Sequence, residues 1–113
     1  MEKIIYLNSD TMGFGSDELG KILVRNFLLT IAEDQNLKIK AIFLVNAAVK
    51  LACEGSHVLD ALGELENKGA KIYSCGTCLD YFNLKEKLKS GTAGNMKLLC
   101  AQLCDENTFV IRP

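Results

Sequence analysis

Apolar residues along the chain fall into two kinds of segment. Short apolar runs of strand length occur at residues 3–8, 38–46, 70–73 and 108–111. Between them lie longer segments whose apolar residues recur every three or four positions, as on one face of a helix. Strands that alternate with helices, without a two-residue hairpin turn, predict a mainly parallel sheet with helices on both faces. The strand residues expected to be buried are Ile4, Ile5, Ile42, Phe43, Leu44 and Ile72.

The ends of the predicted helices carry recognisable signals. Ser16 is expected to be the N-cap of the first helix, and Ser56 to cap the next, which Gly69 ends. Residues 47–52 are predicted to form a short helical turn, and residues 90–95 a loop. The predicted buried faces are Leu19, Ile22, Leu23, Phe27 and Ile31 in the first helix, Val58, Leu59, Leu62 and Leu65 in the next, and Met96, Leu99, Cys100 and Leu103 in the last. Leu79, Tyr81, Phe82, Leu84 and Leu88 predict a further helix that ends within residues 85–89.

Length and charge exclude several classes of protein. The chain has 113 residues, of which 49% are hydrophobic, and a net charge of -1, as expected for one globular domain over residues 1–113. It has no basic stripe, so binding to nucleic acid or to an anionic membrane is not expected. No apolar run approaches the ~20 residues of a transmembrane helix, and the N-terminus lacks a signal-peptide pattern. We therefore expect a cytoplasmic protein whose five cysteines stay reduced.

The most distinctive chemistry lies at Cys75 and Cys78, where a predicted strand turns into a helix. Backbone N–H groups at the start of a helix stabilise a thiolate and lower its pKa below the ~8.5 of a free cysteine. Cys75 directly follows the strand and is expected to react first, while Cys78, three residues on, can reach back to it. Gly76 and Thr77 are expected to donate hydrogen bonds to the developing thiolate. This turn is therefore the candidate catalytic site.

Other predicted loops should meet at the same edge of the sheet, because ligands bind outside the carboxyl ends of parallel strands. Ser9 and Gly13 follow the first strand, Asn46 follows the second, and Asn95 lies in the loop before the last helix. With Gly76 and Thr77, these residues form the predicted substrate-binding set.

Alternative interpretations of the cysteines remain open. A thioredoxin-like site is disfavoured, because that fold needs a cis-proline and the one proline is Pro113. Cys100 and Cys104 lie one helical turn apart and are able to complete a zinc site with the Cys75 pair. The apolar surroundings of Cys100 favour packing instead, so no metal and no cofactor are expected. Cys53 is interpreted as a packing residue, and His57, the one histidine, as a partly exposed residue of a helical first turn.

The segment Ser74-Cys75-Gly76-Thr77-Cys78-Leu79-Asp80 resembles the DsrE/DsrF-like family, and is most similar to the C-terminal domain of YedF-type selenium-metabolism sulfurtransferase-like proteins. The similarity extends over residues 8–13, 17–20, 43–46, 62–69 and 94–96. It implies a three-layer α/β/α sandwich with a mainly parallel sheet of about five strands. It also implies assembly into dimers, trimers or hexamers, for which the apolar residues Leu79, Tyr81, Phe82 and Leu84 are a candidate interface.

The resemblance implies a sulfur relay. Cys75 would accept persulfide sulfur, or selenium, and Cys78 would release it. YedF-type proteins carry a carrier-like domain before this one, so here a small sulfur-carrier protein is expected to act in trans. The alternative is a non-catalytic module of the same fold that binds a small ligand or partner and whose cysteines serve packing.

Overall fold

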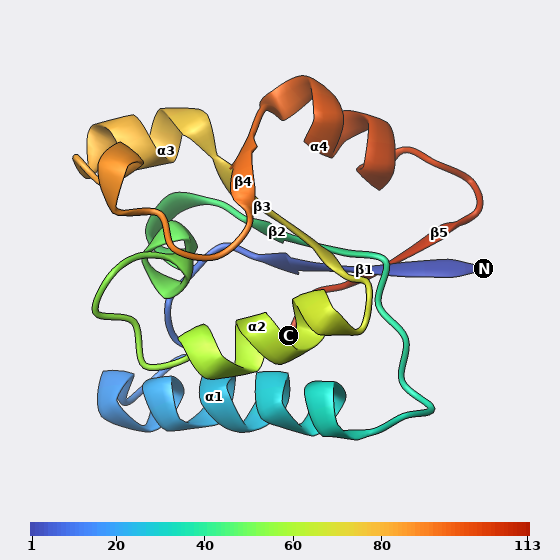
Figure 1. Cartoon of the computed structure of the whole chain (residues 1–113), viewed down its shortest axis with the longest axis horizontal. Coiled ribbons are helices and arrows are strands. Elements are labelled where there is room, and N and C mark those ends of the chain that lie inside the picture. The colour runs from blue at the N-terminus through green and yellow to red at the C-terminus, as the bar shows by residue number, and fades with distance from the viewer.

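The computed structural model describes residues 1–113 as one five-stranded sheet with helices above and below it (Figure 1). Every strand pair is parallel, and the strand order is β4-β3-β2-β1-β5. The strands are β1 (Glu2–Leu7), β2 (Ala41–Leu44), β3 (Lys71–Cys75), β4 (Thr92–Gly94) and β5 (Thr108–Ile111). The helices are α1 (Asp17–Glu33), α2 (Leu59–Asn67), α3 (Gly76–Tyr81) and α4 (Met96–Leu103), with two 3-10 segments, η1 (Asn46–Ala52) and η2 (Lys85–Lys87).

The helices divide between the two faces of the sheet. α1 and α2 lie side by side below it in Figure 1, and α4 lies above it. The lower face packs into a core of 20 buried residues that includes Ile5, Ile42 and Ile72, whereas the upper face buries only Ile4, Ala41, Phe43 and Leu99. The predicted three-layer α/β/α sandwich is confirmed. None of the helices is long and apolar enough to span a bilayer.

Strand positions and two helix ends agree with the sequence analysis. All six strand residues that were expected in the core are buried. The hydroxyl of Ser16 accepts a hydrogen bond from Leu19 N over 3.2 Å and caps α1, and Gly69 ends α2 with a φ of 102°. Ser56 does not cap α2 as expected. Its hydroxyl accepts a hydrogen bond from Val58 N, and α2 begins at Leu59 with no side-chain cap.

The predicted buried face of α1 was wrong in part. Leu19, Ile22 and Leu23 are exposed, and the buried residues are Gly20, Val24, Leu28, Ile31 and Ala32. Gly20 explains this rotation. A Cβ there would lie 2.7 Å from the Thr11 side chain, so α1 turns its glycine toward the loop that follows β1. The residues four and eight positions further on then face the sheet.

Three predictions between β3 and β5 were also wrong. α3 ends at Tyr81 because Asn83 takes a φ of 57°, which a helix does not allow, and residues 85–87 form a separate 3-10 turn. The expected loop 90–95 contains β4, a three-residue strand that pairs with β3. On α4, Cys100 is exposed and Leu99 is the buried residue, because this eight-residue helix rests on the sheet through one narrow side.

Candidate functional site

The two thiols lie at the carboxyl end of β3. Cys75 is the last residue of β3 and the N-cap of α3, and Cys78 lies in the first turn of that helix. Both side chains are half-buried, so they are neither sealed in the core nor freely exposed. β3 lies between β2 and β4, so the ends of both neighbouring strands flank the thiols.

The end of β4 approaches this turn closely. Cys75 pairs with Gly94 in the β3–β4 register, and a Cβ on Gly76 would lie 3.3 Å from the Gly94 carbonyl oxygen. Glycine at position 76 therefore lets the two strand ends meet without displacing either. This contact brings the Asn95 loop to the edge of the site, as the sequence analysis expected.

On the other side, the residue after β2 contacts Cys78. The backbone N–H of Asn46 donates a hydrogen bond to Cys78 Sγ over 3.1 Å. Asn46 has a φ of 53°, a left-handed conformation that asparagine tolerates better than most residues. This conformation turns the amide of Asn46 toward the sulfur, whereas its side chain is exposed.

The surroundings of Cys78 favour its protonated form. Burial raises the pKa of the Cys78 thiol above its ordinary value, and the hydrogen bond with Cys75 and the charge on that residue raise it further. The N–H of Asn46 offsets part of this by lowering the pKa. At neutral pH Cys78 is therefore a protonated thiol.

Cys75 also borders a small apolar cavity between the sheet and the start of α4. Its volume is about 10 Å³, roughly the space of one water molecule. The walls come from β2, β3 and the Gly94–Leu99 segment, and include Tyr73, Ser74 and Met96. The hydroxyl of Ser74 is fully buried and has no hydrogen-bond partner. Such an unpaired hydroxyl costs about 1–3 kcal/mol, and it lies one residue from the thiol.

The side chains of the remaining predicted binding residues form no hydrogen bond with the thiols. The Asn95 side chain accepts from Leu98 N over 2.8 Å and caps α4, so its oxygen is already engaged. Thr77 is exposed on α3. The Ser9 hydroxyl bonds to Thr11, and Gly13 is exposed with nothing near its Cβ position. Both follow β1, which is separated from β3 by β2, and neither contacts the thiols.

The other cysteines do not join the site. Cys100 and Cys104 are both exposed, on and just after α4. No group of three or more His, Cys, Asp or Glu side chains is arranged to hold a metal ion. Cys53 is buried, its Sγ donates to Val49 O over 3.2 Å, and burial raises its pKa. Cys53 therefore packs in the core as expected.

Sequence reasoning missed two features of this site. The first is the backbone N–H of Asn46, which binds Cys78 Sγ. The sequence showed only an asparagine at the end of a strand, from which we expected the side chain to take part. Ser74 was part of the recognised segment but had no assigned role, and its burial depends on the packing of β3 between two strands.

Comparison with known proteins gives matches of two kinds. The DsrE/DsrF-like family matches residues 11–103. The crystal structure of YchN protein from E. coli has a TM-score of 0.70 at 19% identity, over 100% of both chains. Two proteins of unknown function are also similar. MTH1491 from Methanobacterium thermoautotrophicum has a TM-score of 0.68 at 15% identity, over 99% of this chain and 98% of its own. BT1422 from Bacteroides thetaiotaomicron has a TM-score of 0.66 at 17% identity, over 99% of this chain and 95% of its own. No curated protein matched.

At these identities the solved structures show a shared fold alone. The family match is stronger, because it spans most of the chain and includes Cys75 and Cys78. The closer similarity to YedF-type proteins stays a prediction. On the match over residues 11–103, the chain belongs to the DsrE/DsrF-like family.

Proposed function

We propose that this protein is a cytoplasmic sulfur relay protein that carries persulfide sulfur, or selenium in its place, on Cys75. Three observations support the proposal. Cys75 is half-buried at the carboxyl edge of the sheet, Cys78 lies three residues further on in the first turn of α3, and the chain belongs to the DsrE/DsrF-like family, for which the resemblance implies a sulfur relay. The observation that carries it is the placement of two half-buried thiols in one strand-to-helix turn at the carboxyl edge of the sheet.

In the loading step, the thiolate of Cys75 attacks the terminal sulfur of a persulfide on a small carrier protein. The S–S bond of the donor breaks, its electron pair leaves on the donor thiolate, and Cys75 holds the sulfur as a persulfide. The half-buried position of Cys75 leaves the outer sulfur accessible to a partner but shields the bond beneath it.

In the transfer step, an acceptor thiolate attacks the outer sulfur and the electron pair returns to Cys75 Sγ. Cys78 assists here because its S–H group can donate a hydrogen bond to the sulfur that becomes negative.

Without an acceptor, Cys78 provides a second route. It loses its proton and attacks Cys75 Sγ, which forms a disulfide and expels hydrosulfide. The N–H of Asn46 stabilises the negative charge on Cys78 during this attack. An external dithiol must then reduce the disulfide before another cycle.

Intact-mass spectrometry after incubation with glutathione persulfide tests the proposal. We expect the wild type to gain the mass of one sulfur, Cys75→Ser to gain none, and Cys78→Ser to gain it but release it slowly to dithiothreitol. Cys104→Ser, which changes an exposed cysteine outside the site, should behave as the wild type. Normal loading of both Cys75→Ser and Cys78→Ser would exclude this turn as the sulfur site. Loading that is lost only in Cys78→Ser would reverse the two roles.

A further inference from the structure

A second cavity, of about 570 Å³, is lined by neither Cys75 nor Cys78. We refer to it as the charged cavity. Its lining includes the charged residues Asp10, Lys21, Lys50 and Glu54, together with His57 and the buried Cys53, and Leu51, Phe82 and Leu84 supply apolar surface. Its volume is in the range of small-molecule sites. It shares no lining residue with the small cavity beside Cys75, so it is a separate feature.

The charges that line the charged cavity are not paired with one another. The ion pairs of the structure are Arg25–Asp60, Lys40–Glu2 and Lys85–Asp80, and none includes a residue of this lining. Lys50 Nζ lies 4.6 Å from the centre of the Phe82 ring, where the aromatic face holds the ammonium without neutralising it. Two ammonium and two carboxylate groups are therefore available to a ligand.

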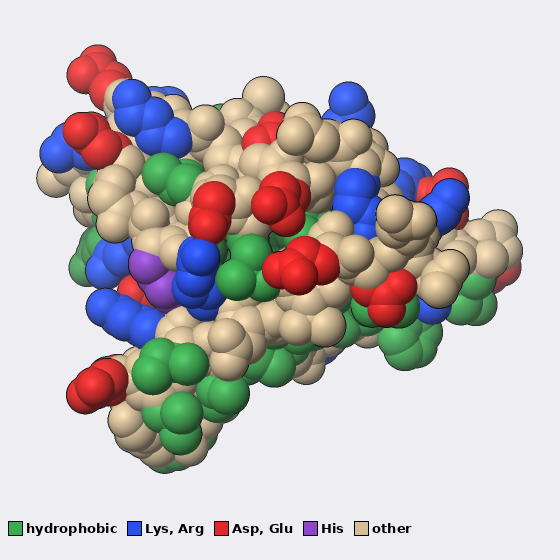
Figure 2. All heavy atoms as spheres, turned by 60° about the horizontal axis from the view of Figure 1, so that its bottom comes forward, with side chains coloured by type: hydrophobic (Ala, Val, Ile, Leu, Met, Phe, Trp, Pro, Cys, Tyr) green, Lys and Arg blue, Asp and Glu red, His purple; other side chains and the backbone are tan.

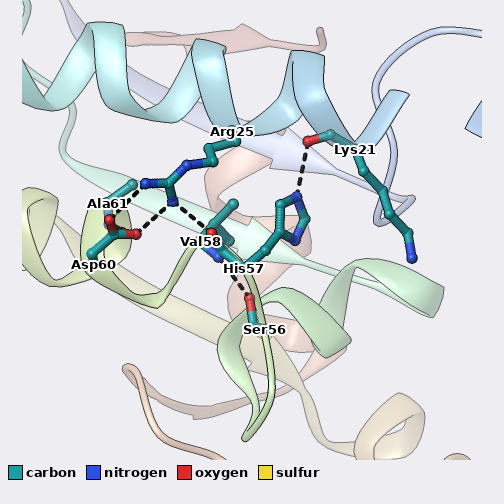
Figure 3. Close-up of polar contacts among 7 residues, drawn as sticks. All are labelled: Lys21, Arg25, Ser56, His57, Val58, Asp60 and Ala61. Carbon is teal, nitrogen blue, oxygen red and sulfur yellow. Dashed lines mark hydrogen bonds and ion pairs between the residues drawn. The ribbon is translucent and has the colours of Figure 1, made fainter. Parts of the chain in front are cut away.

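One wall of the charged cavity is held rigidly (Figure 3). The Nε2 of His57 lies 2.8 Å from the carbonyl oxygen of Lys21. A carbonyl only accepts, so Nε2 is the donor and Nδ1 is the free ring nitrogen of the neutral side chain. The guanidinium of Arg25 donates to the carbonyl oxygen of His57 over 2.5 Å and forms a bidentate pair with Asp60 at 2.7 and 2.8 Å.

These contacts tie the loop before α2 to α1, and they fix where the His57 ring stands before any ligand arrives. A binding site whose groups are already in place loses less entropy on binding than a flexible one. Figure 2 shows the histidine with Lys, Arg, Asp and Glu side chains close around it on this face.

The balance of charges indicates the class of ligand. A simple anion in this cavity would be repelled by the carboxylates of Asp10 and Glu54. A simple cation would be repelled by the ammonium groups of Lys21 and Lys50. A zwitterion satisfies both pairs at once. The surface of Leu51, Phe82 and Leu84 favours an apolar group on the same molecule. We propose that the charged cavity binds a free α-amino acid with an apolar side chain.

The single histidine makes a direct test possible, because its ring Hε1 proton gives one isolated NMR signal from the cavity wall. L-leucine is the probe, titrated into the full chain at constant pH. We expect a saturable shift of the His57 signal with a dissociation constant on the order of 1 mM or below. Isocaproate lacks the ammonium group and isoamylamine lacks the carboxylate, and each should bind at least about tenfold more weakly.

Variants that each remove one charge test whether L-leucine binds in the charged cavity. Lys50→Met and Glu54→Gln change exposed residues and should each weaken L-leucine binding by about fivefold or more. Lys97→Met and Glu106→Gln are matched controls on exposed residues elsewhere, and should bind as the wild type. Absence of a saturable shift overturns the proposal. Equal binding of isocaproate, or unchanged binding in both cavity variants, overturns it as well.

Discussion

The backbone N–H of Asn46 points at the sulfur of Cys78 over 3.1 Å, and so connects the end of β2 to the first turn of α3. This donor lowers the pKa of Cys78, but burial and the neighbouring Cys75 raise it more. Cys78 is thus held in place by β2 while Cys75 controls part of its acidity. The two thiols are expected to respond to each other's removal.

Alkylation by iodoacetamide measures this coupling. In Cys75→Ala the hydrogen bond and the charge that raise the pKa of Cys78 are both lost, whereas burial remains. The pH midpoint of Cys78 alkylation should therefore move to lower pH, because more thiolate is present at each pH. Peptide mass spectrometry across a pH series gives the midpoint. Cys104→Ala should leave it unchanged, and an unchanged or higher midpoint in Cys75→Ala would refute the coupling.

Gly91 supports the same edge of the sheet from the loop before β4. It has a φ of +71°, and a Cβ there would lie 2.7 Å from Cβ of Ile72 on β3. Gly91→Ala should lower the free energy of unfolding by about 3 kcal/mol, through strain and overpacking together. Gly63→Ala is the matched control within α2, where nothing lies near the added Cβ, and should raise stability by about 0.5 kcal/mol. Urea unfolding measures the free energy of unfolding of both variants. An equal change in the two would contradict the close contact at Gly91.

The surface expected to drive self-association differs from the one that the sequence suggested. Leu79 is fully buried and therefore unavailable, although Tyr81 is exposed. A longer apolar stripe lies on the outer side of α1, where Leu19, Ile22 and Leu23 are exposed at helical spacing. Exposed apolar patches usually mark an interface, so we predict a homo-oligomer that uses this stripe.

Light scattering tests this assembly. Ile22→Lys places a charge in the middle of the stripe and should shift the protein toward the monomer, whereas Asn107→Lys, at an exposed position outside α1, should have little effect. A wild-type monomer at micromolar concentration would contradict the prediction, and an oligomer that Ile22→Lys leaves intact would place the interface elsewhere.

The sequence predicted those features that depend on local pattern. Ile42, Phe43 and Leu44 form an uninterrupted apolar run, and a strand covered on both faces is the simplest way to bury all three. The thiol pair was recognisable for a similar reason, because a glycine-containing turn after a strand is a local signal. Its position at the carboxyl edge then followed from the parallel sheet.

Features that depend on distant contacts were not predictable in this way. Apolar residues surround most of α1, so periodicity alone did not decide between Leu23 and Val24 as the buried position. The contact of Gly20 with Thr11 decided it. β4 has no apolar run and exists because it pairs with β3. The Asn46 amide joined the site only because β2 and β3 are neighbours.

The ion pair of Arg25 with Asp60 predicts how stability responds to acid. Arg25 lowers the pKa of Asp60 from 3.8 to about 2, mainly through their hydrogen bonds. As pH falls through 3.8, the unfolded chain takes up a proton at this site before the folded one does. The stabilisation is therefore present above pH 3.8 and is lost by about pH 2.

Asp60→Asn cannot titrate, so the wild type should be the more stable protein near neutral pH and this advantage should shrink as the pH falls through that window. Both partners are partly exposed, which keeps the difference small and sensitive to salt. Urea midpoints at low ionic strength, measured on either side of the window, give the difference. Glu106→Gln, which removes a carboxylate without an ion pair, serves as the control. A difference that stays constant or grows in acid would show that the Arg25 pair does not stabilise the fold, and the rigid wall beside His57 would need another explanation.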